Sequence, residues 1–293
     1  MRALAAYALL PGMKRILVTG ATGNLGRAVV STLKNAGFNV RAAARNPSKL
    51  AATSGVEPVL FAYENQATHA TALQDVDGLF LVAPPLDAEA PAKLNPVIDL
   101  AKTRGVRHIV FTSALGVDAV EQAPLRIVER HLMASGVPYT ILRPNFFMEN
   151  FSTGFLAPML KQGGIFLAAA DGKTSFISVT DIAGVVAVAF RKGLASREFN
   201  LTGPEALDHA AVAALISKVS GRRITYQSIP EEAMLSSLRG TGMPESAVQY
   251  VGALYSAVRA GHMAAVTNDV ETVTGTKPTT FEAFAIQNKM AWA

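Results

Sequence analysis

Short apolar runs alternate with amphipathic stretches along the first half of the chain. The runs are rich in Val, Ile, Leu and Phe and predict six buried strands, at 14–20, 39–45, 56–63, 78–84, 107–115 and 139–147. Between them, apolar residues recur at helical spacing at 24–37, 68–76, 94–105 and 124–136. Strands that alternate with helices in this way form right-handed βαβ units around a parallel sheet. We therefore predict the α/β fold class, with a Rossmann-type doubly wound parallel sheet.

The pattern changes after Phe151. Glycine-rich segments precede a helix from about Asp181, a strand at 197–203 and several further helices, the last near 280–292. This part predicts a smaller, mostly helical C-terminal lobe, and part of it is expected to return to the sheet. The predicted limits are a loose extension at 1–12, with Met13 as an alternative start, a Rossmann domain at 13–150 and the lobe at 151–293.

Three glycines spaced three residues apart, Gly20, Gly23 and Gly26, follow the first predicted strand. In a dinucleotide-binding turn the first glycine permits the tight turn, the second lets backbone amides approach a pyrophosphate, and the third allows close packing of helix on strand. The start of the following helix adds the positive end of its dipole. Because the motif joins a strand to a helix in a βαβ unit, it predicts a dinucleotide site rather than a purely structural turn.

The end of the second strand indicates which dinucleotide is bound. Sites for NAD place an acid there to hold the ribose hydroxyls. This strand ends in Arg45, with Lys49 nearby, and no acid lies between Phe38 and Leu50. Two cations suit the additional 2′-phosphate of NADP, so we predict NADP(H) as the cofactor of the Rossmann domain. The alternative is that both residues are ordinary solvated surface charges.

The composition narrows the classes of function, ligand and location that remain open. Lys and Arg number 27 against 22 acids, a net charge of +5, and no basic block is present, which favours anionic small molecules over nucleic acid. The absence of cysteine excludes disulfides and thiolate chemistry, and the five histidines lack metal-ligand spacing. No apolar run approaches the roughly 20 residues of a membrane helix. We expect a cytoplasmic protein without a metal, a membrane segment or a nucleic-acid partner.

Several stretches together, GATGNLG, RNPSK, RHIVFTSALG, SGVPYTILRPNFFMENF and FISVTDIA, resemble the NmrA-like branch of the atypical short-chain dehydrogenases. The resemblance extends from Met13 to the C-terminus. This branch includes type 2 quinone oxidoreductases, triphenylmethane reductases, relatives of isoflavone reductase and nitrogen-metabolite regulators. It therefore implies the fold and NADP(H) binding, while the reaction stays open.

Carried over by position, the resemblance implies two sets of contacts. Cofactor contacts are expected at Gly20, Thr22, Gly23, Asn24, Leu25, Gly26, Arg45, Lys49, Val82, Ala83, Pro84, Thr112, Ser113, Pro144, Asn145 and Phe146. Substrate contacts are expected at Phe147, Met148 and Phe151, with Tyr255 from the helical lobe. For the aromatic residues the alternative is ordinary core packing.

Three positions depart from the family pattern. Asn145 stands where glycine is frequent, Ala62 where an Asp is common, and Arg130 where some members carry a lysine.

A catalytic acid is not evident. Ordinary short-chain dehydrogenases use Tyr-x-x-x-Lys on a helix, but none of the six tyrosines here has lysine four residues later. Tyr139 and Arg143 have the spacing, yet in a strand they would lie roughly 13 Å apart. The catalytic residue is therefore unknown, with Ser113 and His131 as the remaining candidates. Hydride transfer to a quinone yields a stabilised oxyanion that water can protonate, so positioning can suffice.

Two functional hypotheses follow. The first is an NADPH-dependent reductase of a quinone or similar flat conjugated acceptor, with the 151–293 lobe binding the hydrophobic substrate. The second is a non-catalytic, NADP(H)-binding, redox-sensing regulator, which the missing Tyr-x-x-x-Lys dyad keeps open. A homodimer or a regulatory protein partner is compatible with either hypothesis.

Overall fold

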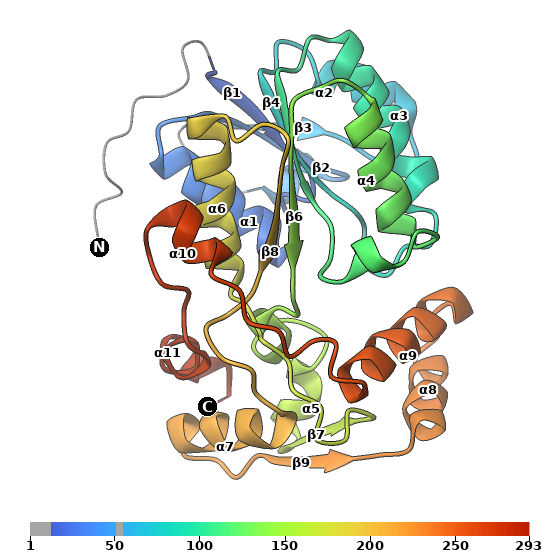
Figure 1. Cartoon of the computed structure of the whole chain (residues 1–293), viewed down its shortest axis with the longest axis vertical. Coiled ribbons are helices and arrows are strands. Elements are labelled where there is room, and N and C mark those ends of the chain that lie inside the picture. Colours follow the sequence, from blue (N-terminus) through green and yellow to red (C-terminus); the bar gives the residue numbers. More distant parts are fainter. Residues whose placement is uncertain (1–12, 51–54, 293) are drawn as a thin grey trace. The chain divides into compact units, whose positions relative to one another are not determined.

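A seven-stranded sheet organises the first of two compact units of the chain (Figure 1). The computed structural model describes residues 13–50 and 55–292, so the predicted extension at 1–12 lies outside the described residues. The first unit takes in residues up to Pro84, then Glu89–Arg143 and Thr180–Phe199. The strands of its sheet are β1 Arg15–Val18, β2 Asn39–Ala44, β3 Val56–Leu60, β4 Gly78–Val82, β5 His108–Thr112, β6 Tyr139–Pro144 and β8 Arg197–Leu201.

The strand order is β3-β2-β1-β4-β5-β6-β8, and the pairs from β3 through β6 are parallel. The order reverses direction at β1, where Ile16 lies opposite Val40 on one side and Gly78 on the other. This is the doubly wound arrangement that the alternating pattern predicts. Pro58 is tolerated in β3 because that strand lies at the edge of the sheet and pairs only with β2.

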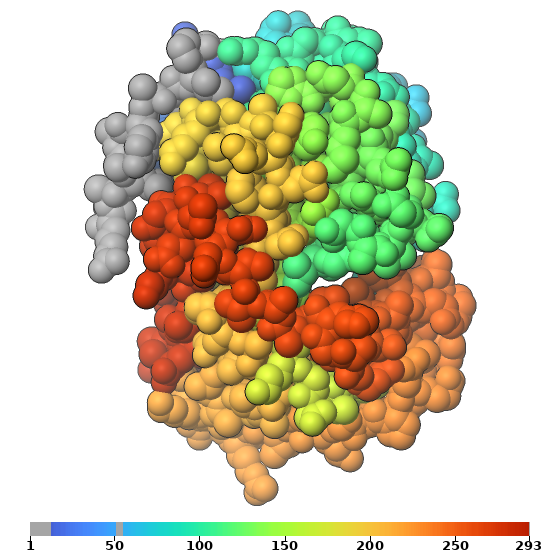
Figure 2. Space-filling view, viewed as in Figure 1, coloured from blue at the N-terminus to red at the C-terminus, as the bar shows by residue number. Residues whose placement is uncertain are grey.

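Helices cover both faces of the sheet, which is why the central strands are apolar at nearly every position. One face carries α2 His69–Ala72, α3 Ala90–Thr103 and α4 Pro124–Ala134, and the other carries α1 Asn24–Asn35 and α6 Val179–Lys192 (Figure 1). Seen from outside, α6 in yellow and α4 in green form much of the visible surface of this unit (Figure 2). The short 3-10 turns η1 Pro47–Lys49, η2 Gln66–Thr68 and η3 Val117–Ala119 complete the loops.

The seventh strand, β8, comes from sequence beyond residue 150. It follows α6 and takes the edge position beside β6, where the Ser196 N–H donates to the Tyr139 carbonyl at 2.7 Å. A segment after residue 150 thus belongs to the sheet. The domain limits 13–150 and 151–293 stay a prediction, because contacts within one chain do not show whether either part folds by itself.

The second unit comprises Pro85–Ala88, Pro144–Val179 and the chain from Asn200 onward. It holds a two-stranded parallel sheet of β7 Gly164–Leu167 and β9 Thr225–Ser228. Its core is aromatic: Phe151 packs edge-on against Phe176 and Phe281, and the Trp292 indole donates to the Phe151 carbonyl at 2.7 Å. Its other elements are η4 Met148–Phe151, α5 Ala157–Lys161, α7 His209–Ser220, α8 Glu231–Gly240, α9 Glu245–Arg259, α10 Asp269–Thr274, α11 Phe281–Gln287 and η5 Lys289–Ala291.

Within residues 13–50 and 55–292, every helix is too short or too polar to cross a membrane.

Candidate cofactor site

The glycine turn joins β1 to α1 at the carboxyl end of the sheet. Gly20 has a φ of +62°, in the left-handed region that favours glycine, and a Cβ there would lie 2.8 Å from the Val82 side chain. A Cβ on Gly26 would lie 2.0 Å from the Gly20 carbonyl oxygen and 2.6 Å from its carbon. These contacts, and a third at 2.9 Å to the Ala21 Cα, are all to backbone, so no rotamer change relieves them. The first and third glycines are therefore required by the turn itself.

Gly23 differs from its neighbours in the motif. Its φ is −81°, which any residue adopts, and a Cβ there would meet only the Gly20 carbonyl oxygen, at 3.4 Å. The residue is exposed. The fold alone thus accepts a side chain at this position, whereas a ligand lying against the turn would not.

Helix α1 begins at this turn with unused donors. Gly23 is its N-cap and supplies no side-chain bond, and the first turn carries no acid. Among the described residues, the amides of Asn24, Leu25 and Gly26 donate to no acceptor. Free amides at the positive end of a 12-residue helix are suited to an anion, so the pyrophosphate contacts expected at this turn stay a prediction.

The end of β4 is held against this turn by two side chains that the sequence analysis did not single out. The buried Thr19 hydroxyl donates to the Phe80 carbonyl at 3.1 Å and accepts from the Val82 N–H at 3.0 Å. The Tyr63 hydroxyl donates to the Val82 carbonyl at 2.6 Å. Val82 is thereby fixed through both its backbone groups, with Ala83 and Pro84 following it. A hydroxyl directly before the first glycine is the only signal for Thr19 in the sequence.

Arg45 and Lys49 lie at the carboxyl end of β2, next to the turn. The two strand ends are linked by the Ala21 N–H, which donates to the Ala43 carbonyl at 3.3 Å. Both cations are exposed, and neither has an acidic partner among the described residues. Asn46 stabilises η1 by accepting from the Ser48 N–H at 3.1 Å. The cations are thus free to bind an anionic ligand.

Thr112 ends β5 and Ser113 follows it, and the two residues are 5% and 6% exposed. Neither hydroxyl lies in hydrogen-bonding geometry with another described group, although the Ser113 hydroxyl is close enough to Glu129 to contribute to lowering its pKa. A ligand would reach either hydroxyl only after the side chain turns outward. The other catalytic candidate, His131, lies 2.7 Å from Asp99 of α3 through Nε2. The catalytic role of both residues stays a prediction.

A buried ion pair lies behind these strand ends. Glu129 of α4 has a fully buried side chain and accepts two hydrogen bonds of 2.8 Å from Arg143 of β6 and one of 3.0 Å from Arg126. Burial alone would raise the pKa of Glu129, but the Arg143 guanidinium beside it lowers that pKa overall. Arg143 also contacts Glu198 of β8 at 2.5 Å. The Tyr139 and Arg143 spacing is therefore not a catalytic dyad, because Arg143 is committed to carboxylates.

The residues predicted to contact the substrate lie in the second unit. Met148 and Phe151 are fully buried, and Tyr255 is 1% exposed, with burial raising its pKa. Their burial favours core packing, and their role as substrate contacts stays a prediction. Phe146 and Phe147 are partly exposed. Pro144 and Asn145 are buried, and the Asn145 side chain is engaged by protein groups.

The other two departures from the family pattern have local explanations. Ala62 accepts from the His69 ring at 2.9 Å, and its N–H donates to the Thr68 hydroxyl at 3.1 Å, so this turn is held without a carboxylate. Arg130 is exposed and pairs with Glu121 at 2.6 Å.

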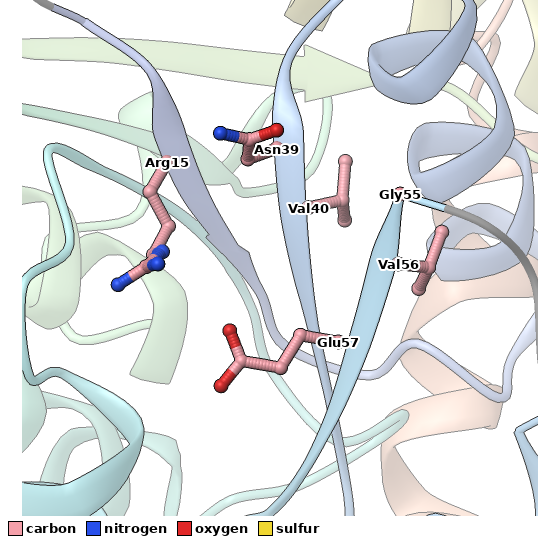
Figure 3. Close-up of a pocket in the computed structure, with 6 residues that line it drawn as sticks. All are labelled: Arg15, Asn39, Val40, Gly55, Val56 and Glu57. Carbon is pink, nitrogen blue, oxygen red and sulfur yellow. The ribbon is translucent and has the colours of Figure 1, made fainter.

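A cavity of about 280 Å³ lies at the opposite end of the strands (Figure 3). It is lined by the starts of β1, β2 and β3, namely Arg15, Asn39, Val40, Gly55, Val56 and Glu57. Ligands of doubly wound sheets bind at the carboxyl ends of the strands, so this cavity is not the cofactor site. In the described part of the chain, no group of three His, Asp or Glu side chains could hold a metal ion.

Comparison with known proteins agrees with this geometry. The model of the NmrA-like family matches residues 12–285, which is most of the chain. The chain belongs to the NmrA-like family. Among its relatives are the NAD(P)H azoreductase of Xenophilus azovorans, 32% identical over 92% of this chain and 96% of that protein, and the agroclavine dehydrogenase of Claviceps fusiformis, 33% identical over 94% and 98%.

Two solved structures have the same fold as this chain. The NADPH-dependent quinone oxidoreductase of Escherichia coli, in complex with NADPH, has a TM-score of 0.81 and 27% identity, covering 94% of this chain and 99% of that one. NmrA, a negative transcriptional regulator, shares the fold with a TM-score of 0.70 at 17% identity, covering 94% and 95%. The predicted family and the Rossmann-type fold are both confirmed.

Proposed function

We propose that this protein is an NADPH-dependent reductase that transfers hydride to a quinone or a similar flat conjugated acceptor. The observation that carries the proposal is the glycine turn, where the first amides of α1 donate to no acceptor among the described residues and where Gly23 is not required by the fold itself. The relatives support it, because an azoreductase, a dehydrogenase and a quinone oxidoreductase share the family.

The residues present fit NADPH. The amides at the start of α1 would hold the pyrophosphate, and the exposed Arg45 and Lys49 would hold the 2′-phosphate. Val82, fixed by Thr19 and Tyr63, would form the wall beside the adenosine. When bound, NADPH supplies the hydride, and the chain's own task is to orient cofactor and acceptor and to exclude water.

An acceptor whose reduced anion is stabilised does not require a catalytic acid from the protein. In a quinone, the charge that follows hydride addition is delocalised over the ring and oxygen, so solvent can protonate it. This accounts for a site without a Tyr-x-x-x-Lys dyad. We assign the aromatic segment from Phe146 to Phe151 to the acceptor side, which moves Phe146 from the expected cofactor contacts to the acceptor surface. Its partly exposed members Phe146 and Phe147 would make the contacts.

The second candidate function is a non-catalytic redox sensor. The fold shared with NmrA, a negative transcriptional regulator, favours it, together with the missing dyad. A sensor would bind NADP and NADPH with clearly different affinities and would pass that difference to a protein partner. A cytoplasmic location and a homodimer belong to both hypotheses as predictions.

The experiment is NADPH oxidation by the purified protein, followed by absorbance against a panel of quinones, azo dyes and conjugated enones. NADH and a protein-free sample are the controls. Turnover with preference for NADPH supports the reductase and begins to define its acceptor. Tight NADPH binding without turnover on any acceptor contradicts the reductase and favours the sensor.

A further inference from the structure

Asn145 is a buried amide that joins three segments of the second unit. It lies directly after β6 and is 3% exposed. Its Nδ2 donates to the Ser175 hydroxyl at 2.8 Å and to the Met263 carbonyl at 2.9 Å, and its Oδ1 accepts from the Phe146 N–H at 2.8 Å. Both hydrogens of the amide are thus used by protein groups, which leaves none for a cofactor.

Ser175 forms a second link to the same region. Its side chain is fully buried, its hydroxyl donates to the Ala265 carbonyl at 2.7 Å, and its N–H donates to the Met263 carbonyl at 3.0 Å. Residues 260–268 connect α9 to α10, so Asn145 and Ser175 both bond to this connection, and the hydrogen bond between them joins the turn after β6 to residue 175. A fully satisfied buried polar network of this kind has one preferred geometry, because every alternative leaves a buried group unpaired.

This network fixes the backbone of Phe146, which is partly exposed. Its N–H is held by Asn145, and its carbonyl accepts from the Ile177 N–H at 3.0 Å. Its ring is partly exposed and lies 6.1 Å from the ring of Tyr255 on α9. A flat apolar surface held from both sides of its backbone is suited to stacking against a flat conjugated ligand.

We propose that Asn145 is a specificity-determining positioning residue, which holds Phe146 and the 260–268 connection as a rigid wall for large, flat acceptors. The inference rests on the proposed reductase function. It reassigns Asn145 from the cofactor contacts expected by resemblance to a role behind the acceptor surface. The reason for an effect on specificity is entropic: a loosened wall must be ordered by each acceptor that stacks on it, and this weakens the largest contact surface most.

The test compares Asn145→Ala and Ser175→Ala with Asn288→Ala. The last is a matched control in the same unit, because it removes an amide that, within the part of the chain that the structure describes, donates to the Phe284 carbonyl of the adjoining helix α11 and to no other group. Steady-state constants are measured with a single-ring benzoquinone and a three-ring phenanthrenequinone, and NADPH affinity is measured separately by fluorescence titration.

For Asn145→Ala we expect the KM of the three-ring acceptor to rise about fivefold to tenfold, while kcat and the NADPH Kd change less than twofold. Loss of binding that is equal in ground and transition states raises KM alone. Ser175→Ala is expected to act in the same direction and carries the test if Asn145→Ala does not fold. In Asn145→Ala, amide hydrogen exchange should accelerate at residues 145–148 and 260–268. In Asn288→Ala, exchange at these two segments should stay at the wild-type rate.

A purely structural role gives a different result. It would reduce the active fraction, so kcat would fall for both acceptors alike with KM unchanged, and that outcome overturns the inference. An equal change in KM for the two acceptors also overturns it. If the wild-type protein binds NADPH but oxidises it with no acceptor of the wider panel, the proposed reductase function fails together with this inference. Turnover of other acceptors but of neither quinone, or unchanged constants in an active variant, overturns the inference alone.

Discussion

Substitution of Gly26 by alanine separates what the turn needs for folding from what it needs for binding. The added Cβ would lie 2.0 Å from the Gly20 carbonyl oxygen, 2.6 Å from its carbon and 2.9 Å from the Ala21 Cα. Cβ atoms essentially never approach another heavy atom within 3.0 Å, so α1 and the turn must separate by at least about 1 Å. All three atoms belong to the backbone, and no side-chain rotation can relieve the overlap.

We expect Gly26→Ala to lower the free energy of unfolding by about 3 kcal/mol, the upper part of the usual range for overpacking. For a chain of this size that corresponds to a fall in Tm of roughly 6–12 °C. Scanning calorimetry without cofactor measures it. NADPH affinity should fall as well, because the amides of α1 move with the helix.

Gly23→Ala is the matched control. Its Cβ meets a single atom at 3.4 Å, so the cost is that of alanine in place of glycine at an N-cap, about 0.5 kcal/mol. Tm should therefore change by roughly 2 °C or less, while NADPH binding weakens by at least about tenfold, because the methyl group occupies the approach to the amides. A wild-type Tm for Gly26→Ala would refute the packing argument, and wild-type NADPH affinity for Gly23→Ala would refute the assignment of the ligand to this turn.

Three further predictions concern charge. Arg45→Ala should weaken NADPH binding by about tenfold to a hundredfold, the loss of one charge-assisted contact, and NADH binding less than twofold; titration of both cofactors checks this, and equal losses would contradict it. Glu129→Ala should lower the free energy of unfolding by about 3–5 kcal/mol, because it leaves Arg143 without its buried partner. The double variant Glu129→Leu with Arg143→Met should recover most of that loss. Denaturant unfolding measures both variants, and additive losses would contradict the pairing. Burial lowers the pKa of His209 to about 4. Between about pH 6.5 and pH 4, His209 is therefore protonated in the unfolded chain but neutral in the native protein. The free energy of unfolding falls by up to about 3 kcal/mol as the pH drops through that range. His209→Phe should flatten this slope in thermal unfolding measured from pH 7 to pH 4, and an unchanged slope would assign it to other groups.

The alternation of strand and helix was readable from the sequence because period and polarity are local properties. The six strands at 14–147 and the order of the βαβ units follow from where apolar runs begin and end. The seventh strand is different: residues 197–201 are short and their burial is mixed, so only pairing with β6 makes them part of the sheet.

The candidate site divides in the same way. The geometry of the glycine turn could be predicted because a motif in a short stretch specifies the backbone conformation, whereas the roles of the turn and of Arg45 in binding stay predictions. Thr19 and Tyr63 could not, since their role is to hold Val82, which lies 63 and 19 residues away in the chain. Nothing in their local sequence records that contact.

The sequence by itself determined the family, the doubly wound sheet and the glycine turn, because each depends on residues close together in the chain. Only the tertiary structure decided which side chains are free. It left Arg45 exposed and, among the described residues, without an acidic partner. It committed Arg143 to Glu129 and placed Phe151 and Met148 in a core. It also revealed Asn145 as a junction between segments that are 30 and 118 residues apart. The physical reason is that hydrogen bonds and burial depend on distance in space, and the chain brings remote residues together only when it folds.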